Sequence, residues 1–137
     1  MGCDEVILID THVVIWLTKG DSKLGKQSRS LIDQGREDRR LLFSAISLWE
    51  ISLLAAKDRL SLKQAPEELR HDLLIGGAIE AALSGDIAIN AATLDMHGDP
   101  ADRFIVATAM AHGATLVTAD KALLTWRGKL ARQDAAR

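Results

Sequence analysis

Two aspartates each follow a short apolar run that is typical of a buried β-strand. Asp10 comes directly after residues 6–9 (VILI), and Asp120 comes shortly after residues 115–118 (TLVT). Because the carboxyl ends of parallel strands meet at one edge of a sheet, both carboxylates are expected at that edge. Each aspartate could equally be the N-cap of the helix that follows it, so neither indicates a function by itself.

Two further aspartates open the segment 97–120 (HGDPADRFIVATAMAHGATLVTAD). Asp99 and Pro100 suit the N-cap and the first position of a helix. Asp102, three residues after the cap, could close a capping box with Asp99. It would then lie in the first turn of the helix that leads to the strand 115–118. Arg103 is next to it and is a candidate for local pairing with its carboxylate.

Glu50 lies among apolar residues on its predicted helix. Ile46, Leu53 and Leu54 share its face at helical spacing. A carboxylate in such a stripe loses hydration, so it needs a partner, a cation or a raised pKa. The local alternative is a capping box with Ser47, which matches the pattern S-x-x-E. That box explains a hydrogen bond but not the apolar surroundings, and both interpretations remain open.

Strands and helices must alternate along the chain to position these four acids. The predicted strands are residues 6–9, 41–45, 86–90 and 115–118, and residues 128–133 could add an edge strand. The predicted helices are residues 11–19 (ended by Gly20), 22–35, 47–60, 66–83 and 100–112 (ended by Gly113), with a last helix starting at Asp120. This alternation predicts an α/β fold with a single open parallel sheet of four to five strands, flanked by helices on both faces. A chain of 137 residues suits one domain, 1–137.

If these elements converge, four negative charges share one cleft, and each carboxylate holds its proton to a higher pH. Mg²⁺ or Mn²⁺, which prefer oxygen ligands, would relieve that repulsion. The histidines at positions 12, 71, 97 and 112 show no zinc-like spacing and are expected at the surface or in packing. His12 and His97 could also lie at the mouth of the cleft. The chain has neither a serine nucleophile elbow nor a glycine-rich phosphate loop.

The overall composition argues against a protein that binds nucleic acid through bulk charge. Lys and Arg total 17 against 19 acidic residues, so the net charge is −2. The one cysteine, Cys3, permits no intrachain disulfide, and the first residues do not match a signal peptide. No apolar run approaches the roughly 18 residues of a membrane span. These features predict a soluble, cytoplasmic protein with no membrane association.

Three segments, LIDTHVVIWL, SAISLWEISL and HGDPADRFIVATAMAHGATLVTAD, together resemble the PIN-domain ribonucleases of the VapC toxin type. They occur in the family's order and span most of the chain. The resemblance implies a parallel sheet flanked by helices and hydrolysis of RNA phosphodiester bonds with Mg²⁺ or Mn²⁺. It also implies a small antitoxin protein whose tail blocks the cleft, and a homodimer.

The same resemblance implies roles for individual residues. The family's four acids fall on Asp10, Glu50, Asp102 and Asp120, as catalytic residues and metal ligands. Thr11 and Thr118 match small hydroxyl residues beside the first and fourth acids, where they would hold a metal-bound water. Asp99 is accessory to the site or a cap, and Asp102 is expected to be the aspartate that faces the metal.

Two other functions are compatible with the residues. A metal-dependent α/β phosphatase or phosphotransfer domain would use Asp10 as its nucleophile, although such sites usually have a second aspartate where His12 stands. A non-catalytic binding module would use the acids only as helix caps, and it would gain no thermal stability from metal ions.

Overall fold

The strands of the computed structural model, which describes residues 5–57 and 64–137, form one parallel sheet. In these residues the strands are β1 (Ile7–Ile9), β2 (Leu41–Ser44), β3 (Ile79–Ala81), β4 (Thr115–Thr118) and β5 (Arg132–Asp134). They lie in the order β3-β2-β1-β4-β5, and each neighbouring pair is parallel. The predicted open parallel sheet is confirmed, with β1 at its centre.

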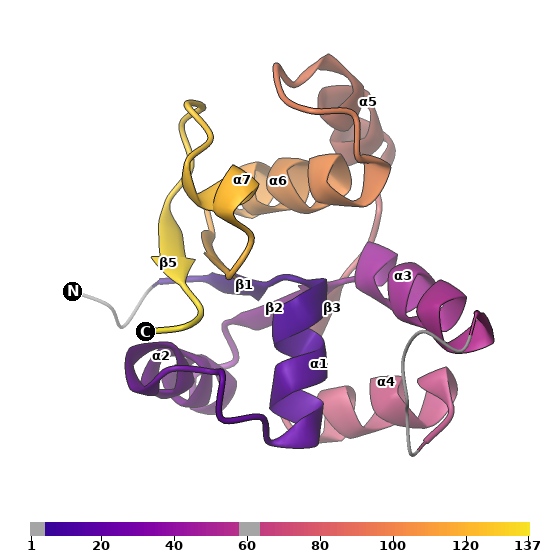
Figure 1. Ribbon diagram of the computed structural model, residues 1–137, viewed down its shortest axis with the longest axis vertical. Helices are drawn as coiled ribbons and strands as arrows, with labels where there is room; N and C mark the ends of the chain where they lie inside the picture. The colour runs from indigo at the N-terminus through magenta and orange to yellow at the C-terminus, as the bar shows by residue number, and fades with distance from the viewer. Residues whose placement is uncertain (1–4, 58–63) are drawn as a thin grey trace.

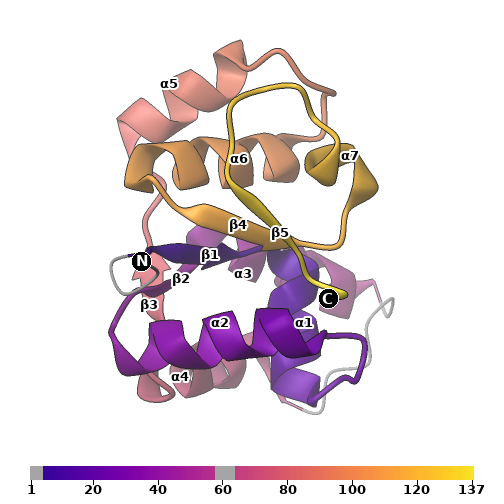
Figure 2. The same ribbon diagram turned by 90° about the vertical axis from the view of Figure 1, so that its left-hand side faces the viewer.

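Helices cover both faces of the sheet (Figures 1 and 2). On one face lie α5 (Gly85–Thr93), α6 (Pro100–His112) and α7 (Lys121–Leu124). On the other face lie α1 (Thr11–Lys19), α2 (Lys26–Glu37) and α4 (Pro66–Ile75). Helix α3 (Ala45–Ala56) follows β2 directly and contacts α1, α4 and α6. It therefore connects the two layers of helices at one side of the molecule.

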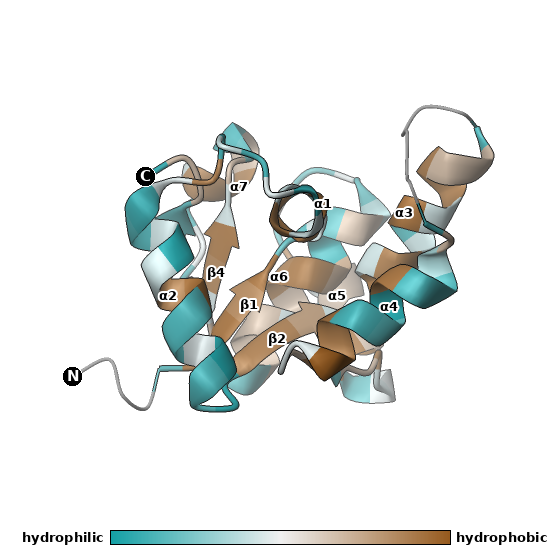
Figure 3. Ribbon diagram, turned by 90° about the horizontal axis from the view of Figure 1, so that it is seen from below, coloured by the Kyte–Doolittle hydropathy of each residue, from teal (hydrophilic) through white to brown (hydrophobic). Residues whose placement is uncertain are grey.

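The strands direct alternate side chains to the two layers, as a sheet buried on both faces requires. Ile7 and Ile9 pack in the core formed with α1, α2 and α4, whereas Leu8 packs in the core formed with α6. Leu116 and Val117 divide between the two cores in the same way. Figure 3 shows the strands β1, β2 and β4 in the brown of apolar residues, whereas α2 and α4 are mostly in the teal of hydrophilic residues.

The predicted strand 86–90 is wrong, because these residues belong to helix α5. Its alternating isoleucines suggested a strand, but Ser84 accepts a hydrogen bond from the Ile87 N–H at 3.2 Å and caps a helix. Ile87 and Ala91, one helical turn apart, are buried against α6. Ile89, which a buried strand would cover, is 68% exposed.

The remaining differences concern where elements begin and end. The helix predicted for residues 66–83 ends at Ile75, and Gly77, with φ of 102°, starts the turn into β3. Helix α2 begins at Lys26 rather than at residue 22, and α3 begins at Ala45 rather than after Ser47. The predicted continuation of α3 over residues 58–60 lies outside the described residues, as does Cys3.

The edge strand considered for residues 128–133 is present as β5, slightly later in the chain than expected. The residues after it complete α2, whose N-cap, Gly25, has no side chain for capping. The Gly25 N–H donates to the Ala135 carbonyl at 2.8 Å, and the Ser28 N–H donates to the Arg137 carbonyl at 3.1 Å. The C-terminal segment therefore satisfies backbone donors that the start of a helix leaves free.

Among the helices of residues 5–57 and 64–137, none has the length and apolar character needed to span a lipid bilayer.

Candidate active site

Asp10 combines the two functions that its sequence position suggested. It follows β1 and caps α1, because its Oδ1 accepts the Val13 N–H at 3.0 Å. Its Oδ2 accepts a hydrogen bond from the Thr118 hydroxyl, and the residue is 5% exposed. Burial raises the pKa of Asp10, and the two hydrogen bonds, which favour the charged form, partly oppose that rise. Because burial disfavours the negative charge of Asp10, a nearby cation would stabilise its charged form.

Thr118 connects Asp10 to the second strand-end acid, Asp120. Its hydroxyl donates to Asp10, and its oxygen accepts the Asp120 N–H at 3.1 Å. The Oδ1 of Asp120 caps α7 by accepting the Ala122 N–H at 2.8 Å. Because β1 and β4 are adjacent and parallel, both acids emerge at the same edge of the sheet, as predicted.

Glu50 is not part of a capping box with Ser47. The N-cap of α3 is Ser44, whose hydroxyl accepts the Ile46 N–H at 3.1 Å. Ser47 lies inside the helix, fully buried, with its Oγ 2.9 Å from the Thr11 hydroxyl. Thr11 donates its hydroxyl hydrogen to Glu50, so the hydrogen between Thr11 and Ser47 must come from Ser47. This chain of hydroxyls fixes Glu50 of α3 against the N-terminal end of α1.

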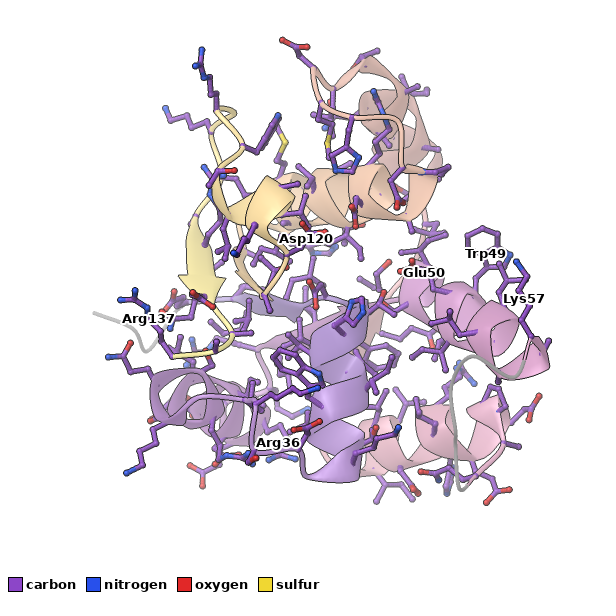
Figure 4. The ribbon with its side chains drawn as sticks, in the orientation of Figure 1. Arg36, Trp49, Glu50, Lys57, Asp120 and Arg137 are labelled. Atoms are coloured by element: carbon purple, nitrogen blue, oxygen red, sulfur yellow. The ribbon has the colours of Figure 1, made fainter. Side chains whose placement is uncertain are left out.

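The predicted apolar surroundings of Glu50 are only partly present. Ile46 is buried, but Leu53 is 37% exposed and Trp49 is 51% exposed. In Figure 4, Glu50 and Asp120 lie close to the N-terminal end of α1, whereas Trp49 lies on the outer side of α3. Glu50 therefore faces the other acids from a partly exposed position.

Asp102 completes the set from the first turn of α6. Burial raises its pKa to about 7, and the negative charges of its acidic neighbours add to the rise, in decreasing order Asp99, Asp120, Glu50 and Asp10. Only carboxylates that share one region of space repel one another in this way. The other three predicted acids therefore lie within electrostatic range of Asp102. Asp99, the accessory acid, caps α6 by accepting the Asp102 N–H at 3.2 Å and is more exposed.

Arg103 does not pair with Asp102. Its guanidinium instead donates to four backbone carbonyls between residues 91 and 97, namely those of Ala91, Leu94, Met96 and His97. The side chain that approaches Asp102 is His97, whose Nε2 lies 3.3 Å from the Asp102 Oδ2. The sequence suggested that His97 could lie at the mouth of the cleft, but the spacing did not indicate this contact.

The donor set of the cluster suits a hard divalent cation, because it consists of carboxylate and hydroxyl oxygens. Within the described residues, no group of three Asp, Glu, His or Cys side chains is already arranged around a single point. Mg²⁺ typically binds one or two carboxylates and keeps several waters, so a compact three-residue group is not a requirement. The excess of negative charge and the buried Asp10 fit such an ion.

Residues 7–126 match the family model described as the PIN domain. The chain belongs to the PIN-domain family.

Relatives of this PIN domain include Ribonuclease VapC22 of Mycobacterium tuberculosis, which is 31% identical over 131 residues. That alignment covers 88% of this chain and 92% of the relative. The structure of VapBC2 from Rickettsia felis bound to a promoter DNA fragment has 17% identity and a TM-score of 0.68, and the match covers 93% of this chain and 97% of that one. A toxin–antitoxin complex from Klebsiella pneumoniae has 21% identity and a TM-score of 0.64, and the match covers 94% of this chain and 97% of that one. The resemblance noted in the sequence is thereby confirmed, as is the fold.

The PIN sheet explains why residues so far apart in sequence meet. Two of the acids follow the adjacent strands β1 and β4, and the other two lie on α3 and α6, which contact each other. Asp10 and Asp120 are helix N-caps and Asp102 lies in the first turn of α6, whereas Glu50 lies in the second turn of α3 and is held by Thr11. The PIN fold thus holds four carboxylates at one sheet edge despite their repulsion.

Proposed function

We propose that this protein is a metal-dependent endoribonuclease that acts as the toxin of a type II toxin–antitoxin pair. The observation that carries the proposal is the meeting of Asp10, Glu50, Asp102 and Asp120 at one edge of the PIN sheet. The relative named as a ribonuclease supports the activity, and the structural neighbours solved as toxin–antitoxin complexes support the biological setting.

The residues in the cluster divide into ion-binding and supporting groups. Asp10, Asp102 and Asp120 would hold Mg²⁺ or Mn²⁺, with Glu50 as a further ligand or as the group that orients the attacking water. When bound, such an ion lowers the pKa of water and neutralises charge that develops on the phosphate. Hydrolysis forms a bond between a water oxygen and phosphorus and breaks the bond from phosphorus to the 3′ oxygen of the ribose.

Two threonines support the acids rather than standing free to hold a water. Thr118 donates to Asp10 and accepts from the Asp120 backbone, so one hydroxyl orients the first and fourth acids. Thr11 donates to Glu50 and thereby keeps this carboxylate directed towards α1. We therefore assign both hydroxyls to positioning of the carboxylates, in place of the water-holding role first expected.

The proposed partners follow from the proposed activity. RNA is the substrate, and a small antitoxin protein would block access to the acids until the nuclease is released. A homodimer is part of the same proposal, as is a cytoplasmic location, where the RNA substrates are found.

The alternative with Asp10 as a covalent nucleophile is disfavoured by geometry. Both carboxylate oxygens of Asp10 already accept hydrogen bonds, from Val13 and Thr118, and the residue is buried. Attack on phosphorus by either oxygen would require loss of one of these bonds and entry of substrate into the space that Thr118 occupies.

RNA cleavage by the purified protein tests the proposal. The wild type should cleave RNA in the presence of Mg²⁺ or Mn²⁺ and lose that activity in EDTA. Asp10→Asn and Asp102→Asn should each reduce cleavage by at least a hundredfold while the protein stays folded. The control is Asp86→Asn, because Asp86 is exposed on α5, away from the cluster. Full activity in both site variants, or an unchanged melting temperature of the wild type on addition of Mn²⁺, would contradict the proposal.

A further inference from the structure

The start of helix α6 contains half of a capping box. In a complete box, the side chain at the third helical position accepts the N–H of the cap residue. Here the Asp99 Oδ1 accepts the Asp102 N–H at 3.2 Å, which is the first half. The second bond, from the Asp99 N–H to the Asp102 carboxylate, is not formed, since the Asp99 N–H donates to the Nδ1 of His97 at 3.2 Å. The imidazole thus accepts the N–H that the Asp102 carboxylate would accept in a complete box.

This bond also decides where the hydrogen of a neutral His97 ring lies. An Nδ1 that accepts a hydrogen bond carries no hydrogen, so the ring hydrogen lies on Nε2. The Nε2 is 3.3 Å from the Oδ2 of Asp102, so His97 is the donor in that contact. The imidazole therefore links the Asp99 backbone to one oxygen of Asp102 in a fixed direction.

The segment that carries His97 is itself tied to α6 and to the C-terminal part of the chain. Arg103 donates to the carbonyls of His97 at 2.9 Å and Met96 at 2.6 Å. The indole of Trp126 donates to the carbonyl of Asp95 at 2.8 Å. These bonds hold the backbone from Asp95 to His97, while the Asp99 N–H holds the His97 ring. The ring is therefore oriented from two sides although it is 40% exposed.

We propose that His97 is a positioning residue of the nuclease site, because its ring joins the Asp99 backbone to Asp102 Oδ2 and orients Asp102 for a divalent cation. The inference rests on the proposed function. Since one oxygen of Asp102 accepts from His97, the other oxygen would be the one available to a cation. Groups that hydrogen-bond to a metal ligand without touching the metal typically change metal affinity or activity by about 10- to 100-fold when they are removed.

Two substitutions test the contributions of the two ring nitrogens separately. His97→Asn keeps an acceptor near Nδ1 for the Asp99 N–H but removes the donor to Asp102. His97→Gln places an amide N–H near Nε2 and keeps that donor. His71→Asn is the matched control, because His71 is exposed on α4 at a distance from the cluster.

The test is calorimetric titration of the purified protein with Mn²⁺, with the RNA-cleavage rate and the metal-free melting temperature measured in parallel. We expect His97→Asn to weaken Mn²⁺ binding by about 10- to 100-fold, with a metal-free melting temperature within a few degrees of the wild type. His97→Gln should recover most of the affinity, and His71→Asn should match the wild type. Nitrogen NMR of the histidine rings should show the hydrogen of His97 on Nε2.

Three results would overturn the inference about His97 alone. They are wild-type Mn²⁺ affinity in His97→Asn, an equal loss of affinity in His97→Asn and His97→Gln, and a hydrogen found on Nδ1. If the wild type neither binds Mn²⁺ nor cleaves RNA, the proposed function fails, and the role of His97 fails with it. The behaviour of the wild type therefore distinguishes the two failures.

Discussion

The hydroxyl of Thr118 donates a hydrogen bond to Asp10, 108 positions earlier in the chain. Since the same oxygen accepts the Asp120 N–H, one buried hydroxyl connects two acids of the proposed site. The backbone joins the same two strand ends, since the Asp10 N–H donates to the Val117 carbonyl at 3.2 Å.

Replacement of Thr118 by valine keeps the shape of the side chain and removes both hydrogen bonds. We expect the free energy of unfolding to fall by about 1–3 kcal/mol, because a buried carboxylate and a backbone N–H lose their partner. RNA cleavage should fall by at least tenfold. Urea denaturation and cleavage assays measure the two effects. Thr93→Val, which removes an exposed hydroxyl on α5, is the control and should stay within about 0.5 kcal/mol. Equal stability of the two variants would contradict the prediction.

The raised pKa of Asp102 predicts a pH dependence of stability in metal-free protein. The folded state holds the proton up to about pH 7, whereas the unfolded chain releases it near its ordinary pKa of 3.8. The unfolded state therefore binds fewer protons between these values, so the stability of the folded state falls as the pH rises from about 4 to about 7. In Asp102→Asn, we expect this decrease in the free energy of unfolding to be smaller by about 2 kcal/mol.

Urea denaturation in EDTA at pH 5 and pH 8 measures the effect of Asp102. The relevant quantity is the difference between wild type and Asp102→Asn, since other acids, including the buried Asp10 with its raised pKa, contribute with the same sign. Mn²⁺ should reverse the trend, because the cation competes with the proton and binds more tightly at high pH. Parallel pH profiles for the two proteins would count against a shared acidic cluster.

Gly25 offers a prediction about the C-terminal segment. A Cβ at this position would lie 2.1 Å from the carbonyl carbon of Arg137, in contact with backbone that cannot easily move. We expect Gly25→Ala to destabilise the protein by about 1–3 kcal/mol in urea denaturation. Gly85 at the start of α5 has open space around it, so Gly85→Ala should be neutral or slightly stabilising. A harmless Gly25→Ala would indicate that the C-terminal segment does not pack on α2.

Arg103 should tolerate lysine poorly, although the charge is unchanged. A lysine amine cannot reach four carbonyls spread over residues 91–97 as the planar guanidinium does. We expect Arg103→Lys to lose about 1–3 kcal/mol of stability and to weaken cleavage through the displaced His97. Arg70→Lys, at an exposed ion pair with Glu80, should change little. Similar losses for both variants would argue against a special role of Arg103.

The parts of the fold that the sequence predicts correctly are those with strong local signals. The run before Asp10 is continuously apolar, and α6 has a cap and proline at one end and Gly113 in the left-handed conformation at the other. Helix α5 could not be recognised from the sequence, since its buried face consists of only Ile87 and Ala91, and the residues that cover this face belong to α6.

Individual acids were predictable, but their contacts were not. The choice between Ser44 and Ser47 as the cap of α3 depends on where β2 ends, and both are serines. The partner of Glu50 is Thr11, which comes from α1 and approaches only when the sheet is assembled. The contact of His97 with Asp102 depends on the bend of the backbone before α6, which local composition does not reveal.

The central place of β1 also affects when the protein can become active during its synthesis. Asp10 is made early, but its partner Thr118 follows 108 positions later. At about 5–20 residues per second, a ribosome needs roughly 5–20 s to cover that distance. Contacts of such long sequence separation also form late in folding, since the loop between them must close first. A nascent chain therefore has no assembled acidic site, and the proposed nuclease can cut RNA only after β4 has joined β1.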